Sequence, residues 1–358
     1  MYSEIDTMPK MYTKNRLLTM MIYGNGMSVI VRKVLVTRDR IDPTAIELLR
    51  SKGFECVFSP PYAEQDEVVR TARDAKVCAI MVSQGKITRS VISASGSVEV
   101  MAKHGSGVNN INLAAAEELG IPVYRAVGGN ATAVAEYTIS LMLSLWKSLP
   151  HLDAATKSGD WLKGSFVGND IRGAKLGLIG LGVIGREVAR LGAALGFDVM
   201  AYDPAPSSAQ HSANGIRLLD TIDQLIRQSD IISLHCPLTP ATRHLVDAKL
   251  LAKMKSTSVL INTARGGIVD EDALADALQN GEIAGAGIDS FEVEPPSRTS
   301  RIWDAPNIIC SPHSAGLTPG AERAMATMAA RFIIDHFEGR AIDPAFRATS
   351  TVHGGLQE

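Results

Sequence analysis

The sequence predicts an α/β fold of two doubly wound domains, each a parallel sheet covered by helices on both faces. Two series of short β-branched segments alternate with helix-like segments, the first starting near residue 33 and the second near residue 174. A long apolar stretch at the start of residues 131–161 separates them. Such alternation is typical of parallel sheets, and 358 residues are enough for two domains.

The first series predicts four strands separated by helices. After the first strand, Asp42 is expected as a helix N-cap, Pro43 at the first helical position and Gly53 at the C-cap. The strands are expected at residues 33–37, 55–59, 77–82 and 98–102.

Residues 1–30 have no sustained pattern, and we expect a disordered leader, with the domain proper beginning near Met27. Lys14, Arg16 and the short apolar run behind them only faintly resemble a signal peptide, because no small-residue cleavage site follows. No apolar run reaches transmembrane length. The tail, residues 348–358, is expected to be loose.

The helix that opens residues 131–161 is too apolar to be exposed, so we expect it at a domain junction or a subunit interface. The second series of strands follows, and a last helix spans residues 320–339. We expect that helix to return to the first domain. The expected domains are therefore residues 31–130 with a return segment 319–347, and residues 131–318 between them.

The stretch "LGLIGLGVIGREVARLGAALGFDVMAYDP" carries a Gly-x-Gly-x-x-Gly row between a predicted strand and a predicted helix. Gly180 permits a tight turn, Gly182 lets main-chain N–H groups approach a pyrophosphate, and Gly185 lets the helix lie close to the strand. Asp203 ends the next strand, where a carboxylate accepts hydrogen bonds from ribose hydroxyls and repels a 2′-phosphate. The stretch therefore predicts a dinucleotide site that favours NAD over NADP.

Three later segments end strands of the second series and carry polar groups. "INTARGGIVDEDAL" holds Arg265, "GIDSFEVEPP" holds Asp289 and Glu294, and "IICSPHSAGLTP" holds His313. Because ligands of open α/β sheets bind at the carboxyl ends of the strands, these loops can converge. An enzyme that transfers a hydride between a dinucleotide and a keto acid needs a cation for the carboxylate and an acid/base for the hydroxyl proton. These three segments supply candidates for both tasks.

The chain resembles the D-isomer-specific 2-hydroxyacid dehydrogenase family, which includes phosphoglycerate dehydrogenases, from about residue 31 to residue 345. The most specific pieces are "GLIGLGVIGREVA", "DIISLHCPLTPATRHLV", "LINTARGGIVDEDAL" and "SPHSAG". The resemblance implies a Rossmann domain inserted in a flavodoxin-like substrate domain, and a homodimer.

The resemblance also implies roles for individual residues. Arg265 would bind the substrate carboxylate and carbonyl, His313 would be the acid/base, and Glu294 would pair with His313 and favour its imidazolium form. Ser106 and Gly107 would offer main-chain N–H groups to the carboxylate. The expected cofactor contacts are Gly180, Leu181, Gly182, Val183, Ile184, Gly185, Asp203, His235, Pro237, Thr242, Thr263, Ala264 and, at the nicotinamide end, Asp289.

Each site residue also has a purely structural interpretation. Arg265 could be a surface arginine, Glu294 part of a solvated turn, Asp289 a cap or turn residue, and His313 a structural histidine. His235 and Cys236 suggest a nucleophile pair, but adjacent strand residues face opposite ways. We expect that loop to line the cofactor instead.

The chain departs from the family pattern in two loops. "GSGVNNIN" has Asn109 and Asn112 where the family usually has aspartate, which keeps the turn and capping geometry but removes charge. "MVSQGKIT" has Lys86 as its only cation where phosphoglycerate dehydrogenases usually have an arginine. One lysine is a poor substitute for a bidentate guanidinium contact with a phosphate. A small acid such as hydroxypyruvate or glyoxylate is therefore expected, with D-3-phosphoglycerate dehydrogenase as the alternative.

Two further classes of protein stay open. A formate dehydrogenase on this fold normally has glutamine beside the histidine, and Glu294 argues against it. An NAD(H)-sensing corepressor could use the same scaffold without catalysis, although the Arg265, Glu294 and His313 set would then have no use.

Composition limits the partners. The formal net charge of −2 and the absence of a basic cluster argue against nucleic acid and membrane surfaces. Four scattered cysteines without a Cys-x-x-Cys pair predict no metal site and a reducing cytoplasm. The chain ends soon after the last helix, so we expect no appended regulatory domain.

Overall fold

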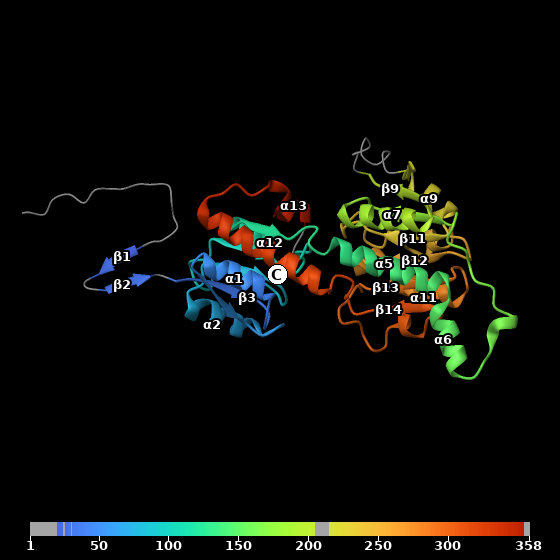
Figure 1. Cartoon of the computed structure of the whole chain (residues 1–358), viewed down its shortest axis with the longest axis horizontal. Helices are drawn as coiled ribbons and strands as arrows, with labels where there is room; N and C mark the ends of the chain where they lie inside the picture. The colour runs from blue at the N-terminus through green and yellow to red at the C-terminus, as the bar shows by residue number, and fades with distance from the viewer. Residues whose placement is uncertain (1–19, 24–25, 30, 205–214, 354–358) are drawn as a thin grey trace, which may run out of the picture. The chain divides into compact units, whose positions relative to one another are not determined.

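The computed structural model describes residues 20–23, 26–29, 31–204 and 215–353 (Figure 1). The chain forms two compact units. The first contains the residues up to Ala126 together with those from Arg323 onward, and the second is Val127–Glu322. The boundaries predicted from the sequence lie after residues 130 and 318.

The first unit is built on a six-stranded sheet in the order β15-β7-β6-β5-β3-β4. All neighbours are parallel except β15, which pairs antiparallel with β7 at the edge. The strands are β3 (Arg32–Val36), β4 (Phe54–Phe58), β5 (Ala79–Val82), β6 (Val100–Lys103), β7 (Val123–Arg125) and β15 (Arg347–Ala348).

Helices cover both faces of this sheet, because alternate strand residues point to opposite sides. Val34 and Val36 belong to a core with α1 (Pro43–Ser51) and α12 (Pro319–Glu338). Leu35 faces the other core, which α2 (Gln65–Ala75), α3 (Arg89–Ser93) and α4 (Leu113–Glu118) complete. The last long helix thus packs beside the first one, as Figure 1 shows.

The first helix starts as predicted but ends one residue earlier than expected. The Asp42 carboxylate caps it by accepting from the Thr44 N–H at 2.9 Å, and Pro43 is its first residue. Lys52 is the C-cap, and Gly53 follows it at φ +80°, in the left-handed region where glycine avoids a steric penalty.

The second unit contains a seven-stranded, wholly parallel sheet in the order β10-β9-β8-β11-β12-β13-β14. The order reverses beside β8, which is the switch point of a Rossmann fold. The strands are β8 (Lys175–Ile179), β9 (Asp198–Tyr202), β10 (Arg217–Leu218), β11 (Ile231–Leu234), β12 (Val259–Asn262), β13 (Gly285–Ile288) and β14 (Ile308–Cys310). With two such sheets, the predicted fold class is confirmed.

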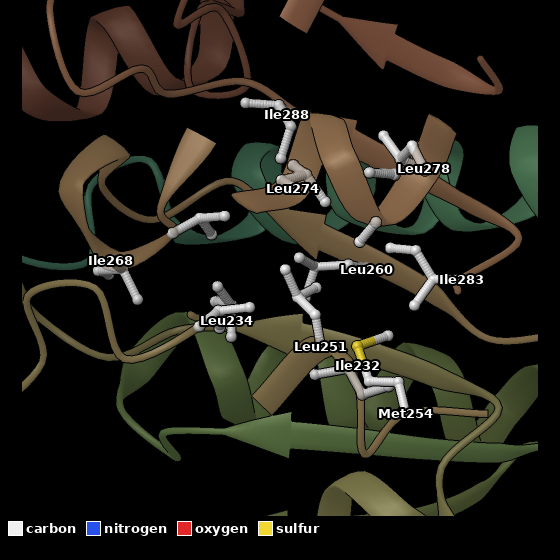
Figure 2. Packing of buried hydrophobic residues seen from close by; sticks show 14 of the residues in the cluster. Ile232, Leu234, Leu251, Met254, Leu260, Ile268, Leu274, Leu278, Ile283 and Ile288 are labelled. Atoms are coloured by element: carbon white, nitrogen blue, oxygen red, sulfur yellow. The ribbon is translucent and has the colours of Figure 1, made fainter. Parts of the chain in front are cut away.

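Two apolar cores lie on the faces of the second sheet. One contains α5 (Ala131–Trp146) and α7 (Val183–Leu195). The other contains α9 (Ile222–Gln228), α10 (Ala248–Leu251) and α11 (Glu271–Gln279), and Figure 2 shows the contacts between strand and helix residues in it. The apolar helix α5 is thus buried inside the second unit against α7, β12 and β13.

The remaining elements are short. After α5 come α6 (Leu149–Lys157) and a 3₁₀ turn at Leu162–Gly164, and further 3₁₀ turns lie at Gly266–Ile268, Arg301–Asp304 and Pro344–Phe346. No helix among the described residues is long and apolar enough to cross a membrane.

The two ends of the chain carry structure that the sequence analysis did not predict. β1 (Met20–Tyr23) and β2 (Gly26–Val29) pair as an antiparallel hairpin, whereas most of the predicted leader lies outside the described residues. The expectation of a loose tail is wrong as far as residue 353. β15 joins the sheet, α13 (Ser350–His353) follows it, and the Ser350 N–H donates to Glu117 at 2.8 Å.

Candidate active site

The carboxyl ends of five neighbouring strands in the second unit, β8, β11, β12, β13 and β14, lie in register. Leu234 pairs with Ile179 on one side and with Asn262 on the other, and Asn262 pairs with Ile288. Ile288 pairs in turn with Cys310. The loops that follow these strands therefore start from adjacent positions along one edge of the sheet, which is where ligands bind in open α/β folds.

The glycine row forms the turn between β8 and α7. Gly180 has φ +100°, and a Cβ there would lie 2.8 Å from the main chain of His235 and Cys236. A Cβ on Gly185 would lie 2.2 Å from the Gly180 carbonyl oxygen, so only glycine lets the helix approach the turn this closely. A Cβ on Gly182, the N-cap of α7, would meet nothing within 4 Å, so the space in front of this helix N-terminus is open.

Asp203 follows β9 and connects with the same turn. Its Oδ2 accepts the main-chain N–H of Leu181 at 2.6 Å. Leu181 is buried, so its side chain offers no surface, whereas Val183 is exposed and Ile184 is half-buried. The structure thus places Gly182, Val183, Ile184 and Asp203 where a ligand can reach them, and gives Leu181 the role of tying the turn to the next strand.

The loop after β11 is closed by its own hydroxyl groups. Thr242 Oγ1 accepts the Thr239 N–H at 2.7 Å and donates to the Pro237 carbonyl at 2.6 Å. His235 Nε2 lies 2.9 Å from Ser233 Oγ, and burial lowers the pKa of His235 to about 3. Burial raises the pKa of the Cys236 thiol to about 11. Both shifts oppose an ion pair, so His235 and Cys236 do not form an activated nucleophile.

The loop after β12 carries Arg265 and is folded by a buried asparagine. Asn262 Oδ1 accepts the Ala264 N–H at 3.0 Å, and Asn262 Nδ2 donates to the Arg265 carbonyl at 2.8 Å. Asn262 has no exposed surface. Its amide side chain therefore fixes the turn from which the half-buried Arg265 side chain emerges.

Thr263, in the same loop, is almost fully buried. Its Oγ1 lies 2.8 Å from Thr138 Oγ1, and Thr138 donates its own proton to the Val134 carbonyl. Thr263 must therefore donate to Thr138, so this hydroxyl joins the loop to α5.

His313 and Glu294 form a hydrogen-bonded pair. His313 Nδ1 lies 2.9 Å from each carboxylate oxygen of Glu294, and Glu294 Oε1 also accepts the Phe291 N–H at 3.1 Å. The side chains are 47% and 40% exposed, so a substrate can reach the imidazole while the carboxylate orients it.

Glu294 stays ionised in this setting. Burial opposes ionisation, but the hydrogen bond and charge of His313, the Phe291 N–H and the charge of Arg265 outweigh it and hold the pKa of Glu294 below its ordinary value. Burial likewise lowers the pKa of Arg265, which the charge of Glu294 opposes, and a guanidinium stays protonated in proteins. The structure therefore brings Arg265, Glu294 and His313 into one electrostatic cluster.

Asp289, predicted to contact the cofactor, is buried directly after β13. It has no exposed surface, and both carboxylate oxygens accept hydrogen bonds from the loop that carries His313. These hydrogen bonds show that Asp289 supports the loop from within. Its contact with the nicotinamide end of the cofactor stays a prediction.

The first unit contains the loop predicted to bind the substrate carboxylate. Ser106 and Gly107 are half-buried and lie between β6 and α4. The Ser106 carbonyl accepts from Arg125 Nη1 at 3.2 Å, at the end of β7. As expected, Asn112 keeps the capping geometry, because its Oδ1 accepts the Ala115 N–H at 2.9 Å as the N-cap of α4.

Three functional candidates were missed by the sequence analysis: Arg125, Asn262 and Ser311. Each is a polar residue within one position of a strand's carboxyl end. Such positions are a usable signal, but the sequence did not show that their side chains turn toward the loops rather than toward solvent.

The site suits a dinucleotide. The open space in front of Gly182 lies at a helix N-terminus, whose first-turn N–H groups have no intrahelical partners and favour an anion. Asp203 follows the adjacent strand, where a ribose would bring its hydroxyl groups. Gly182, Val183 and Ile184 would hold the pyrophosphate, and Asp203 would hold the ribose.

Comparisons with known proteins agree with this site. Residues 139–315 match the family model described as the D-isomer specific 2-hydroxyacid dehydrogenase, NAD binding domain. The D-3-phosphoglycerate dehydrogenase of Methanocaldococcus jannaschii is 37% identical over 301 residues, which are 84% of this chain and 56% of that protein. The hydroxypyruvate reductase of Thermotoga maritima is 36% identical over 287 residues, 80% of this chain and 92% of that protein. The chain thus spans little more than half the length of the first relative and nearly all of the second.

Solved structures are similar over most of the chain. A glyoxylate reductase from Paecilomyes thermophila superposes with a TM-score of 0.78 at 28% identity, covering 90% of this chain and 99% of that one. The D-lactate dehydrogenase of Escherichia coli gives a TM-score of 0.75 at 28% identity, covering 87% and 98%.

Proposed function

Because the chain belongs to the D-isomer-specific 2-hydroxyacid dehydrogenase family, we propose that it transfers a hydride between NAD(H) and a small D-2-hydroxyacid or its 2-ketoacid. The observation that carries the proposal is the accessible His313–Glu294 pair in one electrostatic cluster with Arg265. The second unit is the cofactor domain in this proposal, and the first unit is the substrate domain.

Each residue of the cluster has a distinct task. NAD(H), when bound, supplies or accepts the hydride. Arg265 binds the substrate carboxylate and polarises its carbonyl. His313 Nε2 gives its proton to the carbonyl oxygen in reduction and takes it back in oxidation, because Nδ1 is engaged by Glu294. The Glu294 anion orients the ring and stabilises its protonated form.

We propose that NAD is preferred to NADP. The negative Asp203 carboxylate, anchored by the Leu181 N–H, would accept hydrogen bonds from ribose hydroxyls and would repel a 2′-phosphate.

Hydroxypyruvate and glyoxylate are the proposed substrates. The loop after β5 carries Ser83 and Gln84 in place of an arginine, and the Ser83 carbonyl is taken by Lys103 Nζ at 2.7 Å. The Thermotoga maritima relative, which this chain spans almost completely, is a hydroxypyruvate reductase. The alternative is D-3-phosphoglycerate dehydrogenase, the name of several relatives; Arg125 beside the Ser106 loop favours it, since it supplies a guanidinium there.

A panel of 2-ketoacids with NADH, followed by loss of NADH absorbance, tests the reaction. Hydroxypyruvate and glyoxylate should give a higher kcat/KM than 3-phosphohydroxypyruvate. A clear preference for the phosphorylated acid would establish the alternative, and binding of NADH without turnover of any acid would point to a corepressor-like protein.

We also propose that the enzyme is a cytoplasmic homodimer. The segment after α5 exposes several large apolar side chains, with Leu149 53%, Trp161 77% and Val167 91% accessible. Side chains as apolar and as exposed as these are available for contact with a second copy of the chain. Light scattering coupled to gel filtration should give twice the mass of one chain, and Trp161→Ser should shift the equilibrium toward the monomer. Four free cysteines fit a reducing compartment such as the cytoplasm, and cell fractionation would test that placement.

A further inference from the structure

Glu292 lies in the loop after β13 and binds groups from two other segments. Its Oε1 accepts from Arg243 Nη1 at 2.9 Å, and each of its carboxylate oxygens lies 3.2 Å from His244 Nε2. Its main-chain N–H donates to Glu271 Oε1 at 2.6 Å, at the start of α11. One residue thus joins the segments that follow β11, β12 and β13.

The main chain beside Glu292 lies against the turn that carries Arg265. A Cβ on Gly266 would lie 1.9 Å from the Phe291 carbonyl carbon and 2.3 Å from the Glu292 nitrogen. No side chain fits in this space, so only glycine lets the two loops meet backbone to backbone. The position of the peptide between Phe291 and Glu292 is therefore coupled directly to the turn from which Arg265 emerges.

The loop after β11 packs on the next glycine. A Cβ on Gly267 would lie 3.2 Å from Arg243 Nη1, so a side chain there would press on the guanidinium. The Gly267 carbonyl also accepts the His244 N–H at 2.8 Å. The Arg243 guanidinium therefore lies against the main chain that follows Arg265 while it holds the Glu292 carboxylate.

The loop after β13 also places the carboxylate of the acid/base pair. Glu294 Oε1 accepts the Phe291 N–H at 3.1 Å, and both Glu294 oxygens lie 2.9 Å from His313 Nδ1. Phe291 is buried. The core thus holds the loop at Phe291 and the ion pair holds it at Glu292, and the place of Glu294 depends on both.

We propose that Arg243 and Glu292 are positioning residues: their ion pair fixes the loop after β13 in the place from which Glu294 orients the imidazole. The proposal rests on the proposed acid/base role of His313. Neither positioning residue donates or accepts a proton in the reaction, and both act through the main chain of their loops.

The positive charge of Arg243 matters because its surroundings are acidic. Burial raises the pKa of Glu271, although the Glu292 N–H opposes the shift, and three nearby carboxylates raise it further: Glu292, Asp272 and Glu294. Like charges this close repel one another. Without the contact from Arg243, the Glu292 carboxylate would be pushed away from its acidic neighbours and the loop would loosen.

Four single variants separate the possibilities. Glu292→Ala removes the carboxylate, and Arg243→Ala removes only the guanidinium. Arg243→Lys keeps the charge, and an ammonium can replace a guanidinium that makes a single contact with the carboxylate. Arg301→Ala is the matched control, because Arg301 is about as exposed as Arg243 and pairs with Asp276 on α11.

The measurements are kcat and KM for hydroxypyruvate, the primary deuterium isotope effect with deuterated NADH, NADH affinity by fluorescence, and hydrogen exchange of the amides in residues 291–294. For Glu292→Ala we expect kcat to fall about 5–50-fold, since small misplacements of a reacting group cost up to about 10²-fold. KM and NADH affinity should stay within about threefold, because a contact that acts only on the reacting geometry lowers kcat. The isotope effect on kcat should rise, and exchange should accelerate in the loop.

The other variants should follow in a fixed order. Arg243→Ala should show the same pattern at smaller size, because His244 still contacts Glu292. The double variant Arg243→Ala with Glu292→Ala should lose no more activity than Glu292→Ala alone, since the two residues act as one unit. Arg243→Lys should keep kcat within about threefold of the wild type, and Arg301→Ala should match the wild type.

Three results would overturn the proposal. Unchanged kcat and unchanged loop exchange in folded Glu292→Ala would mean that the ion pair is an incidental surface contact. A KM for hydroxypyruvate raised more than about tenfold with unchanged kcat in Arg243→Ala would mean that Arg243 binds the substrate itself. NADH binding weakened to that extent with unchanged kcat would mean that Arg243 contacts the cofactor. If Glu292→Ala does not fold, Arg243→Ala and Arg243→Lys decide by the same measurements.

Failure of the proposed function gives a different result. The wild-type protein would then turn over no 2-ketoacid, while hydrogen exchange in residues 291–294 would still report whether the ion pair holds the loop.

Discussion

The two large sheets of the molecule differ in what they carry at the carboxyl ends of their strands. In the second unit, buried Asn262 and Asp289 hold the loops that bear Arg265 and His313, and the Asp289 N–H donates to the Asn262 carbonyl at 2.9 Å. In the first unit, the nearly buried Lys103 donates to the Ser83 carbonyl and to Asn110 Oδ1, and Asn110 Nδ2 donates to the Gly85 carbonyl.

This difference suggests a division of tasks, in which the second unit determines the type of reaction and the first unit determines which acid is bound. The second unit carries an acid/base pair and a guanidinium whose identities define a type of chemistry. The first unit carries loops tied together by hydrogen bonds to carbonyl groups, which define a shape. A keto acid reductase can therefore be proposed from the second unit, whereas the identity of the acid depends on the first.

Among the substitutions that test this comparison, His313→Gln should have the largest effect. If the reaction chemistry lies in the second unit, kcat should fall by about 10²–10⁴, the usual contribution of a general acid/base. NADH affinity should change only a few-fold, because the glycine turn is untouched. His151→Gln, in the exposed helix α6, is the matched control and should retain activity. Near-normal turnover in His313→Gln would remove this residue from the mechanism.

Glu294→Gln should lower kcat for ketoacid reduction. The pKa of Glu294 is lowered in the folded protein, so its carboxylate is charged throughout the neutral range and the charge is lost only as the pH falls through that lowered value. The neutral amide removes a charged hydrogen-bond partner of His313, and such hydrogen bonds contribute about 1.5–3 kcal/mol, so kcat should fall about tenfold or more. An unchanged kcat at neutral pH would show that the charge of Glu294 has no part in the reaction.

The sequence predicted the fold class because its hydrophobic segments follow the alternation of strand and helix almost throughout. Strands β7 and β10 were missed because they are three and two residues long and have too little pattern. The role of Gly180 was predictable, since a tight turn leaves a local mark on the sequence. The enclosure of Asp289 was not, because its partners Ser311 and Ala315 come from a different loop and meet it only in the folded chain.

Asp203→Asn should have a smaller effect on kcat, because its effect is on cofactor binding, and it sharpens the description of the cofactor end. The amide oxygen can still accept the Leu181 N–H, so the turn is kept while the charge is removed. Hydrogen bonds to a charged group contribute about 1.5–3 kcal/mol, so NADH affinity should fall about 10–100-fold. The bias against NADPH should shrink. Asp198→Asn, at the exposed start of the same strand, controls for charge alone, and a wild-type preference for NADPH would contradict the assignment directly.

The smallest effect is expected for chemical modification of the cysteines, and here the two units should behave alike. Each unit has two cysteines, Cys56 and Cys78 in the first and Cys236 and Cys310 in the second. In all four, burial raises the thiol pKa from 9.0 to about 11. A pKa raised by about two units leaves about 100-fold less thiolate at neutral pH, and the thiolate is the reactive form.

Iodoacetamide at neutral pH should therefore label none of the four appreciably, and activity should stay within about twofold of the untreated enzyme. Labelling should rise only as the pH approaches 11, and in urea all four thiols should react quickly. Mass spectrometry of the labelled peptides measures each site separately. Rapid labelling of Cys236 alone, with loss of NADH binding, would mean that the loop beside the Gly180 turn opens in solution, and that the second unit is less firmly held at its cofactor end than at His313.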